Sequence, residues 1–187
     1  PTPTREAREV KIAGLVGWHN SGKTTLLVAL VQELASRGHR VSTIKHAHHA
    51  FDVDTPGKDS WRHRDAGATE VMVGSEKRWA LMHELRDAAE PSLTELLAHM
   101  TPVDLVIVEG FKNEDHDKIE VYRESLDEPL LANIVPNVVA VASDKEVRNL
   151  PPGVSHLDLN DTSAVADYIE QRWSLADPSP HTAMEDA

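Results

Sequence analysis

A glycine-rich segment near the start of the chain has the residue types and spacing that phosphate binding requires. The string "GWHNSGKTT", residues 17–25, fits the pattern G-x-x-x-x-G-K-[ST] between the apolar run 10–16 and an apolar helical pattern. Glycines let backbone N–H groups approach an anion, and the positive end of a helix dipole strengthens the attraction. Lysine supplies a charge for the β- and γ-phosphates, and a threonine hydroxyl supplies a hard oxygen for Mg²⁺. The predicted nucleotide-binding residues are Gly17, Asn20, Ser21, Gly22, Lys23, Thr24 and Thr25, with Lys23 as a catalytic candidate and Thr24 as a metal ligand.

A carboxylate is expected near the metal of such a loop, at the end of a neighbouring apolar strand. The string "LVIVEG" offers one, because four apolar residues are followed by Glu109 and Gly110. A carboxylate at the end of a buried strand is costly unless it has a partner. Two interpretations stay open: Glu109 pairs with Lys112, or Glu109 holds Mg²⁺ and acts in catalysis while the Gly110 N–H faces the γ-phosphate. We favour the second.

The segment "IKHAHHAFDVDTPGKDS", residues 44–60, combines histidines, aspartates and lysines. Imidazole and carboxylate suit zinc or nickel, but the histidine spacing is not the helical i, i+4 arrangement. A solvated loop is a second interpretation, with Thr55 as a helix N-cap and Pro56 at the first helical position. We favour a third, a second anion-binding surface beside the nucleotide. Its predicted residues are Lys45, His46, His48, His49, Asp52 and Lys58, with Asp54 as a further ligand of the nucleotide metal.

The strand-like string "VVAVASD" ends on Asp144 in the last third of the chain. A carboxylate at this position can accept hydrogen bonds from the N1–H and N2–H₂ groups of guanine, whereas adenine has no matching donors. Asp144 can equally cap a helix or face solvent beside Lys145. The prediction is therefore guanine rather than adenine, with both interpretations open.

Strands and helices alternate along the chain, and several of the strands are apolar throughout. This pattern predicts an α/β fold with a mostly parallel central sheet and helices on both faces, a three-layer α/β/α arrangement. Two adjacent strands predict an added β-hairpin. Strands are expected at 10–16, 40–46, 69–75, 78–84, 103–110, 118–123 and 136–144, and helices at 23–38, 58–67, 92–100 and 161–173 with Asp161 as an N-cap.

Length and composition restrict the possible classes of protein. With 187 residues, we expect one domain over 10–176 and flexible tails over 1–9 and 177–187. A formal net charge of −12 argues against nucleic acid as a partner. No run approaches the roughly 20 apolar residues of a membrane span. The absence of cysteine excludes disulfides and thiolate sites, and fits a cytoplasmic protein.

Several motifs together resemble a known family, that of molybdopterin-guanine dinucleotide biosynthesis protein B (MobB). They are "GLVGWHNSGKTTLL", "IKHAHHAFDVDTPGKDSWRHRDAGA", "RWALM", "DLVIVEGFKNEDHDKIEVYR" and "VVAVASD", in order over about residues 10–170. The resemblance implies a P-loop NTPase fold, GTP binding with weak hydrolysis, and a homodimer. It also implies an adaptor role beside the guanylyltransferase that attaches GMP to Mo-molybdopterin.

Two other functions remain alternatives at this point. A metal-delivery GTPase would use the histidines as ligands, although it would be expected to carry cysteine or a longer histidine tract. An ATP-dependent ligase or kinase would need a defined acceptor site. No arginine finger is evident, and Arg62, Arg64 and Arg78 are candidates without a positional argument.

Overall fold

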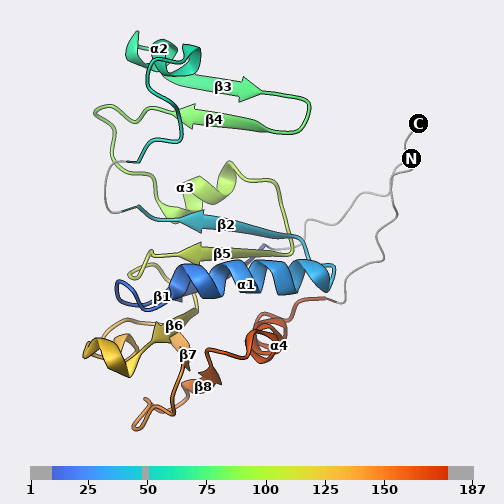
Figure 1. Ribbon diagram of the computed structural model, residues 1–187, viewed down its shortest axis with the longest axis vertical. Coiled ribbons are helices and arrows are strands. Elements are labelled where there is room, and N and C mark those ends of the chain that lie inside the picture. The colour runs from blue at the N-terminus through green and yellow to red at the C-terminus, as the bar shows by residue number, and fades with distance from the viewer. Residues whose placement is uncertain (1–9, 48–50, 177–187) are drawn as a thin grey trace. The chain divides into compact units, whose positions relative to one another are not determined.

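The computed structural model describes residues 10–47 and 51–176, and the larger of its two compact units contains a six-stranded sheet (Figure 1). Every strand pair in this sheet is parallel, and the order is β2-β5-β1-β6-β7-β8. Parallel strands that are buried on both faces read as continuous apolar runs, as this sequence does. The strands are β1 (Lys11–Val16), β2 (Val41–Lys45), β5 (Leu105–Glu109), β6 (Lys118–Tyr122), β7 (Val138–Ser143) and β8 (Ser155–Asp158).

Two long helices, α1 (Lys23–Ser36) and α4 (Thr162–Arg172), pack on one face of the sheet. Leucines at helical spacing on α1 are buried together with Val165 and Ile169 of α4 and with alternate residues of the strands. The Asp161 side chain caps α4 by accepting from the Ala164 N–H at 2.9 Å, as predicted. This face supplies the larger of the hydrophobic clusters.

The other face of the sheet is covered by the short 3₁₀ helix η2 (Leu131–Asn133) and its flanking loops. Glu120, which is fully buried on β6, accepts the N–H groups of Leu131 and Ala132 at 2.8 Å each. Burial raises the pKa of the Glu120 carboxyl, and these two N–H groups oppose that effect. The Glu120 carboxylate thus holds the start of η2 against the sheet. A second 3₁₀ helix, η1 (Glu124–Leu126), lies between β6 and η2 in the chain.

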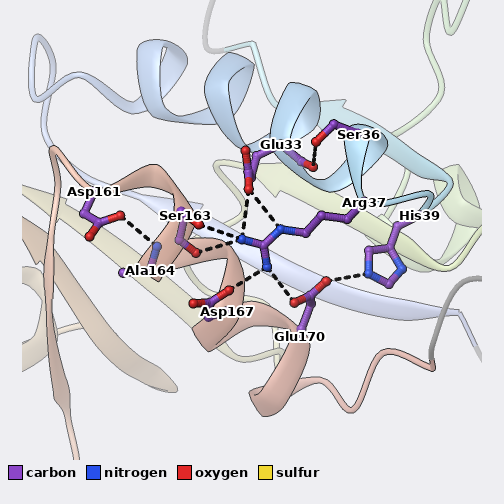
Figure 2. A network of polar contacts seen from close by, with 9 residues as sticks. All are labelled: Glu33, Ser36, Arg37, His39, Asp161, Ser163, Ala164, Asp167 and Glu170. Carbon is purple, nitrogen blue, oxygen red and sulfur yellow. Dashed lines mark hydrogen bonds and ion pairs between the residues drawn. The ribbon is translucent and has the colours of Figure 1, made fainter.

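A cluster of charged side chains joins α1 to α4 (Figure 2). The Arg37 guanidinium lies within 2.6 Å of Asp167 and 2.7 Å of Glu170, and it also pairs with Glu33 one turn earlier on α1. The buried ring of His39 contacts the other carboxylate oxygen of Glu170 at 2.7 Å. A planar guanidinium can satisfy several carboxylates at once, so one residue fixes the helix pair.

Strand β6 is displaced relative to β1, toward the carboxyl end of that strand, while it pairs with β7 along its full length. Gly14 of β1 pairs with Val108, near the end of β5, and with Lys118, at the start of β6. A connection between two parallel strands normally needs a dozen or more residues, because the chain must return to the edge of the sheet where the first strand began. Because β6 starts where β5 ends, the loop 110–117 joins them without a helix. The displacement also carries the end of β6 past the end of β1.

Gly14 lies beneath two buried ionisable side chains. A Cβ atom on Gly14 would lie 2.6 Å from His116 Nε2 and 2.7 Å from Lys118 Cγ. The Lys118 ammonium is fully buried and donates to the carbonyls of Glu114, His116 and Pro136. Neither ring nitrogen of His116 has a hydrogen-bond partner among the described residues. Close packing of these side chains therefore requires glycine in the middle of β1.

The chain divides into two compact units, and the second runs from Ala47 to Met100 between β2 and β5. Helix α2 (Asp59–Asp65) packs against β3 (Glu70–Gly74), the first strand of an antiparallel hairpin in this unit. The Ser92 and Glu95 side chains form a capping box at the start of α3 (Leu93–Ala98). The elements of this unit are α2 (Asp59–Asp65), β3 (Glu70–Gly74), β4 (Trp79–His83) and α3 (Leu93–Ala98).

The predicted α/β class, the mostly parallel sheet and the added hairpin are confirmed. Helix α2 begins at Asp59 with Lys58 as its N-cap, which agrees with the helix expected at 58–67. The alternative in which Thr55 caps this helix was wrong. Strand β8 was not expected, because "SHLD" lacks an apolar run. The single domain over 10–176 stays a prediction, and the predicted tails lie outside the described residues.

Candidate functional site: a phosphate-binding loop

The loop between β1 and α1 has the backbone that the sequence predicts for phosphate binding. Gly22 has φ +98° and Asn20 has φ +62°, both in the left-handed region. A Cβ atom on Gly17 would lie 2.6 Å from the carbonyl oxygen of Val121 and 2.7 Å from Ser21 Oγ, so glycine is required there. The loop therefore folds tightly over the carboxyl end of β1.

Lys23 lies at the first position of α1, and its side chain folds back over this loop. The Nζ atom donates to the carbonyls of Gly17 at 2.9 Å and Trp18 at 2.8 Å. Burial lowers the pKa of the Lys23 ammonium, and the nearby Glu109 carboxylate partly restores it. The lysine is thus held where a phosphate over the loop would meet its charge.

The start of α1 supplies free hydrogen-bond donors. The first intrahelical bond runs from Leu26 N–H to Gly22 O at 3.0 Å, so the N–H groups of Lys23, Thr24 and Thr25 have no acceptor within the helix. The Ser21 N–H is engaged by the carbonyl of Trp18. The Ser21 hydroxyl is buried and has no partner among the described residues. The free N–H groups at the start of α1 and the Ser21 hydroxyl can therefore donate hydrogen bonds to an anion bound over the loop.

Glu109, which is 8% exposed at the end of β5, lies beside the loop. The Thr24 hydroxyl lies 3.5 Å from Glu109 Oε1, and Lys45 Nζ lies 3.9 Å from the same oxygen. The alternative in which Glu109 pairs with Lys112 was wrong: among the described residues the cation paired with Glu109 is Lys45, and Lys112 Nζ lies 4.9 Å from the centre of the Trp18 ring. A hydroxyl and a carboxylate this close are hard oxygen ligands that fit Mg²⁺.

Gly110 and its neighbours form a second tight turn. The Gly110 N–H donates to the Leu15 carbonyl at 3.2 Å, which contradicts the expectation that this N–H faces a γ-phosphate. A Cβ atom on Gly110 would lie 2.8 Å from His46 Cβ, and the His46 ring stacks on the Phe111 ring at 4.7 Å. These contacts indicate that glycine is needed at position 110 because the chain after β5 packs closely against the chain after β2.

Three lysines meet at this end of the sheet in a chain that is strongly acidic overall. Lys45 lies beside Glu109, while Lys112 and Lys45 both lower the pKa of Lys23 by charge repulsion. The repulsion between these lysines is relieved when an anion binds among them, so their proximity favours anion binding. The local charge at the loop is therefore opposite to that of the whole molecule.

Arg123 follows β6 and lies against the loop, a position that the sequence did not predict. Its Nε donates to the Ser21 carbonyl at 3.0 Å, and its Nη1 donates to Asp144 Oδ2 at 2.9 Å. Asp144 is therefore neither a helix cap nor an unpaired acid. The signal available in the sequence was an arginine directly after a buried strand, in "KIEVYR".

The aspartates of the predicted anion loop are engaged within the second unit. Both carboxylate oxygens of Asp52 accept from Arg64 Nη2, at 2.9 and 2.8 Å. Asp54 accepts from Ser60 at 2.8 Å and pairs with Arg64 at 3.3 Å. A metal ion at Asp54 would have to compete with these donors, so its role as a ligand stays a prediction. Lys58 is exposed, and His48 and His49 lie outside the described residues.

The described residues contain neither a ready-made cluster of metal ligands nor a membrane-spanning helix. Over residues 10–47 and 51–176, no group of three or more His, Asp or Glu side chains is arranged to hold a metal ion. No helix in those same ranges has the length and apolar character to cross a bilayer. Arg64, one of the considered arginine fingers, is held by Asp52 and Glu84.

Comparison with known proteins identifies the family. The family model described as molybdopterin guanine dinucleotide synthesis protein B, MobB, matches residues 12–144. The chain belongs to the MobB family. It is 43% identical over 163 residues to the molybdopterin-guanine dinucleotide biosynthesis adapter protein of Escherichia coli (strain K12), covering 86% of this chain and 91% of that protein.

Further relatives agree with the family assignment. The adapter protein of Haemophilus influenzae is 41% identical over 167 residues, covering 87% of this chain and 89% of the relative. The crystal structure of a MobB homologue from Bacillus stearothermophilus matches with a TM-score of 0.65 and 25% identity, covering 88% of this chain and 99% of the other. Membership of the MobB family favours the molybdenum cofactor pathway over the two alternative functions.

Proposed function

We propose that this protein binds GTP and Mg²⁺ at the loop 17–25 and hydrolyses GTP slowly. The observation that carries the proposal is the convergence of Lys23, the free N–H groups of α1 and the Thr24–Glu109 pair at one end of the sheet. Ligands of open parallel sheets bind beyond the carboxyl ends of the strands, where these groups lie.

Thr24 and Glu109 would hold the magnesium ion, because their oxygens lie 3.5 Å apart and both are hard donors. When bound, Mg²⁺ would neutralise charge on the β- and γ-phosphates. Lys23 would leave the Gly17 and Trp18 carbonyls to donate to the same phosphates. Lys45 and Lys112 would attract the anion, as their repulsion of Lys23 indicates.

Asp144 is the proposed reader of guanine. Its carboxylate lies at the end of β7, and its contact with Arg123 uses only Oδ2 among the interactions described. Each carboxylate oxygen has two lone pairs, so acceptors remain for the two N–H groups on the guanine edge. This arrangement supports a preference for GTP over ATP.

In the cell, the protein would act as an adaptor in attaching GMP to Mo-molybdopterin beside the guanylyltransferase, in the cytoplasm. The support comes from the two relatives named molybdopterin-guanine dinucleotide biosynthesis adapter proteins, which are 43% and 41% identical over most of this chain. The loop from Lys45 to Lys58 would contact the phosphorylated pterin or the transferase. His48 and His49 belong to this proposal by sequence alone.

The proposal includes a homodimer that forms through the hairpin β3–β4. Met72 and Leu81 are cross-strand partners on one face, beside Trp79, and their exposures are 64%, 40% and 65%. A two-stranded sheet is marginally stable alone, and exposed apolar patches mark interfaces. The Trp79→Glu variant should sediment as a monomer at concentrations where the wild type is a dimer. Equal masses of the wild type and the variant would contradict a dimer formed through this hairpin.

The nucleotide proposal is tested by calorimetry of GTP and ATP with Mg²⁺. Lys23→Ala should weaken GTP binding by at least about tenfold, equivalent to about 1.4 kcal/mol. Lys11→Ala, which changes a lysine at the opposite end of β1, is the matched control and should leave the affinity unchanged. Equal affinities of wild type and Lys23→Ala would show that the nucleotide binds elsewhere.

A further inference from the structure

Arg123 makes the contact that joins the phosphate-binding loop to the end of β7. Because β6 extends beyond β1, the carbonyl of Val121 and the side chain of Arg123 lie alongside the loop. The guanidinium contacts Ser21 O at 3.0 Å and Asp144 Oδ2 at 2.9 Å through different nitrogens. The Arg123 and Asp144 side chains are 34% and 28% exposed, so solvent only partly screens the pair.

We propose that Arg123 is a positioning residue that aligns the phosphate-binding loop and the base-reading carboxylate as one unit. The inference rests on the proposed function, since it assigns Asp144 to the base and the loop to the phosphates. It adds a residue that sets nucleotide specificity without touching the base.

The contact between Arg123 and the Ser21 carbonyl fixes the peptide bond between Ser21 and Gly22. This bond is planar and trans, so the Ser21 C=O and the Gly22 N–H point in opposite directions. Arg123 holds the carbonyl from one side and thereby directs the Gly22 N–H to the other side of the loop. Gly22 has φ +98°, and a Cβ atom there would approach the Arg123 guanidinium at 3.5 Å. The glycine and the arginine thus orient one phosphate donor together.

The same guanidinium also restrains the side chain of Asp144. A carboxylate on an exposed strand end turns freely about its side-chain bonds, and that freedom is lost when a base binds. The Arg123 contact fixes Oδ2 before the base arrives and leaves lone pairs for the base donors. Only arginine can serve both contacts, because its nitrogens lie in one rigid fork whereas lysine offers a single point charge.

A neighbouring ion pair provides a matched control. Glu124 and Lys145 each follow one member of the Arg123–Asp144 pair, and they lie 3.2 Å apart across the same two strand ends. Their side chains are 69% and 68% exposed. Exposed pairs contribute little to stability, so Glu124→Gln removes a β6–β7 ion pair without affecting the loop.

The experiment compares the wild type, Arg123→Met, Asp144→Asn and Glu124→Gln by calorimetry with GTP, ATP and inorganic tripolyphosphate, all with Mg²⁺. Tripolyphosphate has no base and reports on the loop alone. Asp144→Asn should lower the GTP-over-ATP ratio by about tenfold and leave tripolyphosphate binding unchanged. Arg123→Met should lower both the ratio and the tripolyphosphate affinity, each by about tenfold. Glu124→Gln should change neither.

Thermal melts accompany each variant, and Arg123→Gln replaces Arg123→Met if the latter is unfolded at the assay temperature. A role limited to folding would lower the melting temperature and leave the GTP-over-ATP ratio unchanged, which would overturn the inference. A change in tripolyphosphate affinity alone would overturn the joint role. If the wild type does not bind GTP, the proposed function itself fails; if it binds GTP selectively and Arg123→Met keeps that selectivity, only the present inference fails.

Discussion

The buried ring of His116 predicts an acid-sensitive step in stability. The residue is 9% exposed, and burial is the largest of the effects that lower its pKa from 6.5 to about 4. The Lys118 ammonium acts in the same direction, while Asp117 and Asp115 oppose it. The folded protein therefore holds a neutral imidazole against Gly14. As the pH falls, this imidazole is protonated in the unfolded chain before it is protonated in the folded one.

The sign and size of the effect follow from linkage. Between pH 6.5 and about 4 the unfolded chain binds one proton more than the folded chain at His116, so stability is lost as the pH falls through this range. With about 1.4 kcal/mol for each pH unit between the two pKa values, the loss is about 3 kcal/mol in total. Of this, about 2 kcal/mol should be lost between pH 7.5 and 5.

The assay is urea unfolding of the wild type and His116→Leu across pH 7.5 to 5. Other groups titrate in both proteins, so the informative quantity is the difference between their free energies of unfolding, which should shift by about 2 kcal/mol in favour of the variant as the pH falls. Val108→Ala, a buried apolar substitution at a neighbouring strand, should give a constant offset. A His116→Leu difference that does not change with pH would refute the buried neutral imidazole.

Three further predictions concern packing, charge and metal binding. Gly14→Ala should lower the free energy of unfolding by about 1–3 kcal/mol through its clash with His116, measured by urea unfolding; an unchanged midpoint would contradict this packing. Arg37→Met should cost about 1–3 kcal/mol, less in 1 M salt, and equal losses at both salt concentrations would argue against an electrostatic link between α1 and α4. Glu109→Gln should weaken GTP binding in Mg²⁺ but not in EDTA, by calorimetry, and the same loss in both would exclude a role at the metal.

Much of the fold was predictable because its signals are local. The apolar runs that form β1, β5 and β7 are buried on both faces. A continuous apolar run of this length is typical of a central strand in a parallel sheet, so its place in the fold is predictable. The hairpin was also recognisable from two adjacent strand patterns. Strand β8 was missed because its pattern alternates and is short, so its assignment depends on the neighbour β7.

The partners of charged residues were less predictable. Glu109 was expected to pair either with a metal or with Lys112, which is three residues away, but its nearest cation is Lys45 on the adjacent strand. That contact depends on the strand order β2-β5-β1, which no local pattern encodes. Likewise, the engagement of Gly110 N–H by Leu15 follows from register rather than from composition.

By itself, the sequence determined that a strand, a glycine-rich turn and a helix succeed one another at residues 10–38, because glycine spacing and apolar periodicity act over a few residues. Only the tertiary structure decided that Arg123 supports this turn, across 102 positions of sequence, and that His116 covers Gly14. Both contacts arise from the displacement of β6 along the sheet. Register is set by the packing of all the strands together, so it becomes visible only when the sheet is assembled.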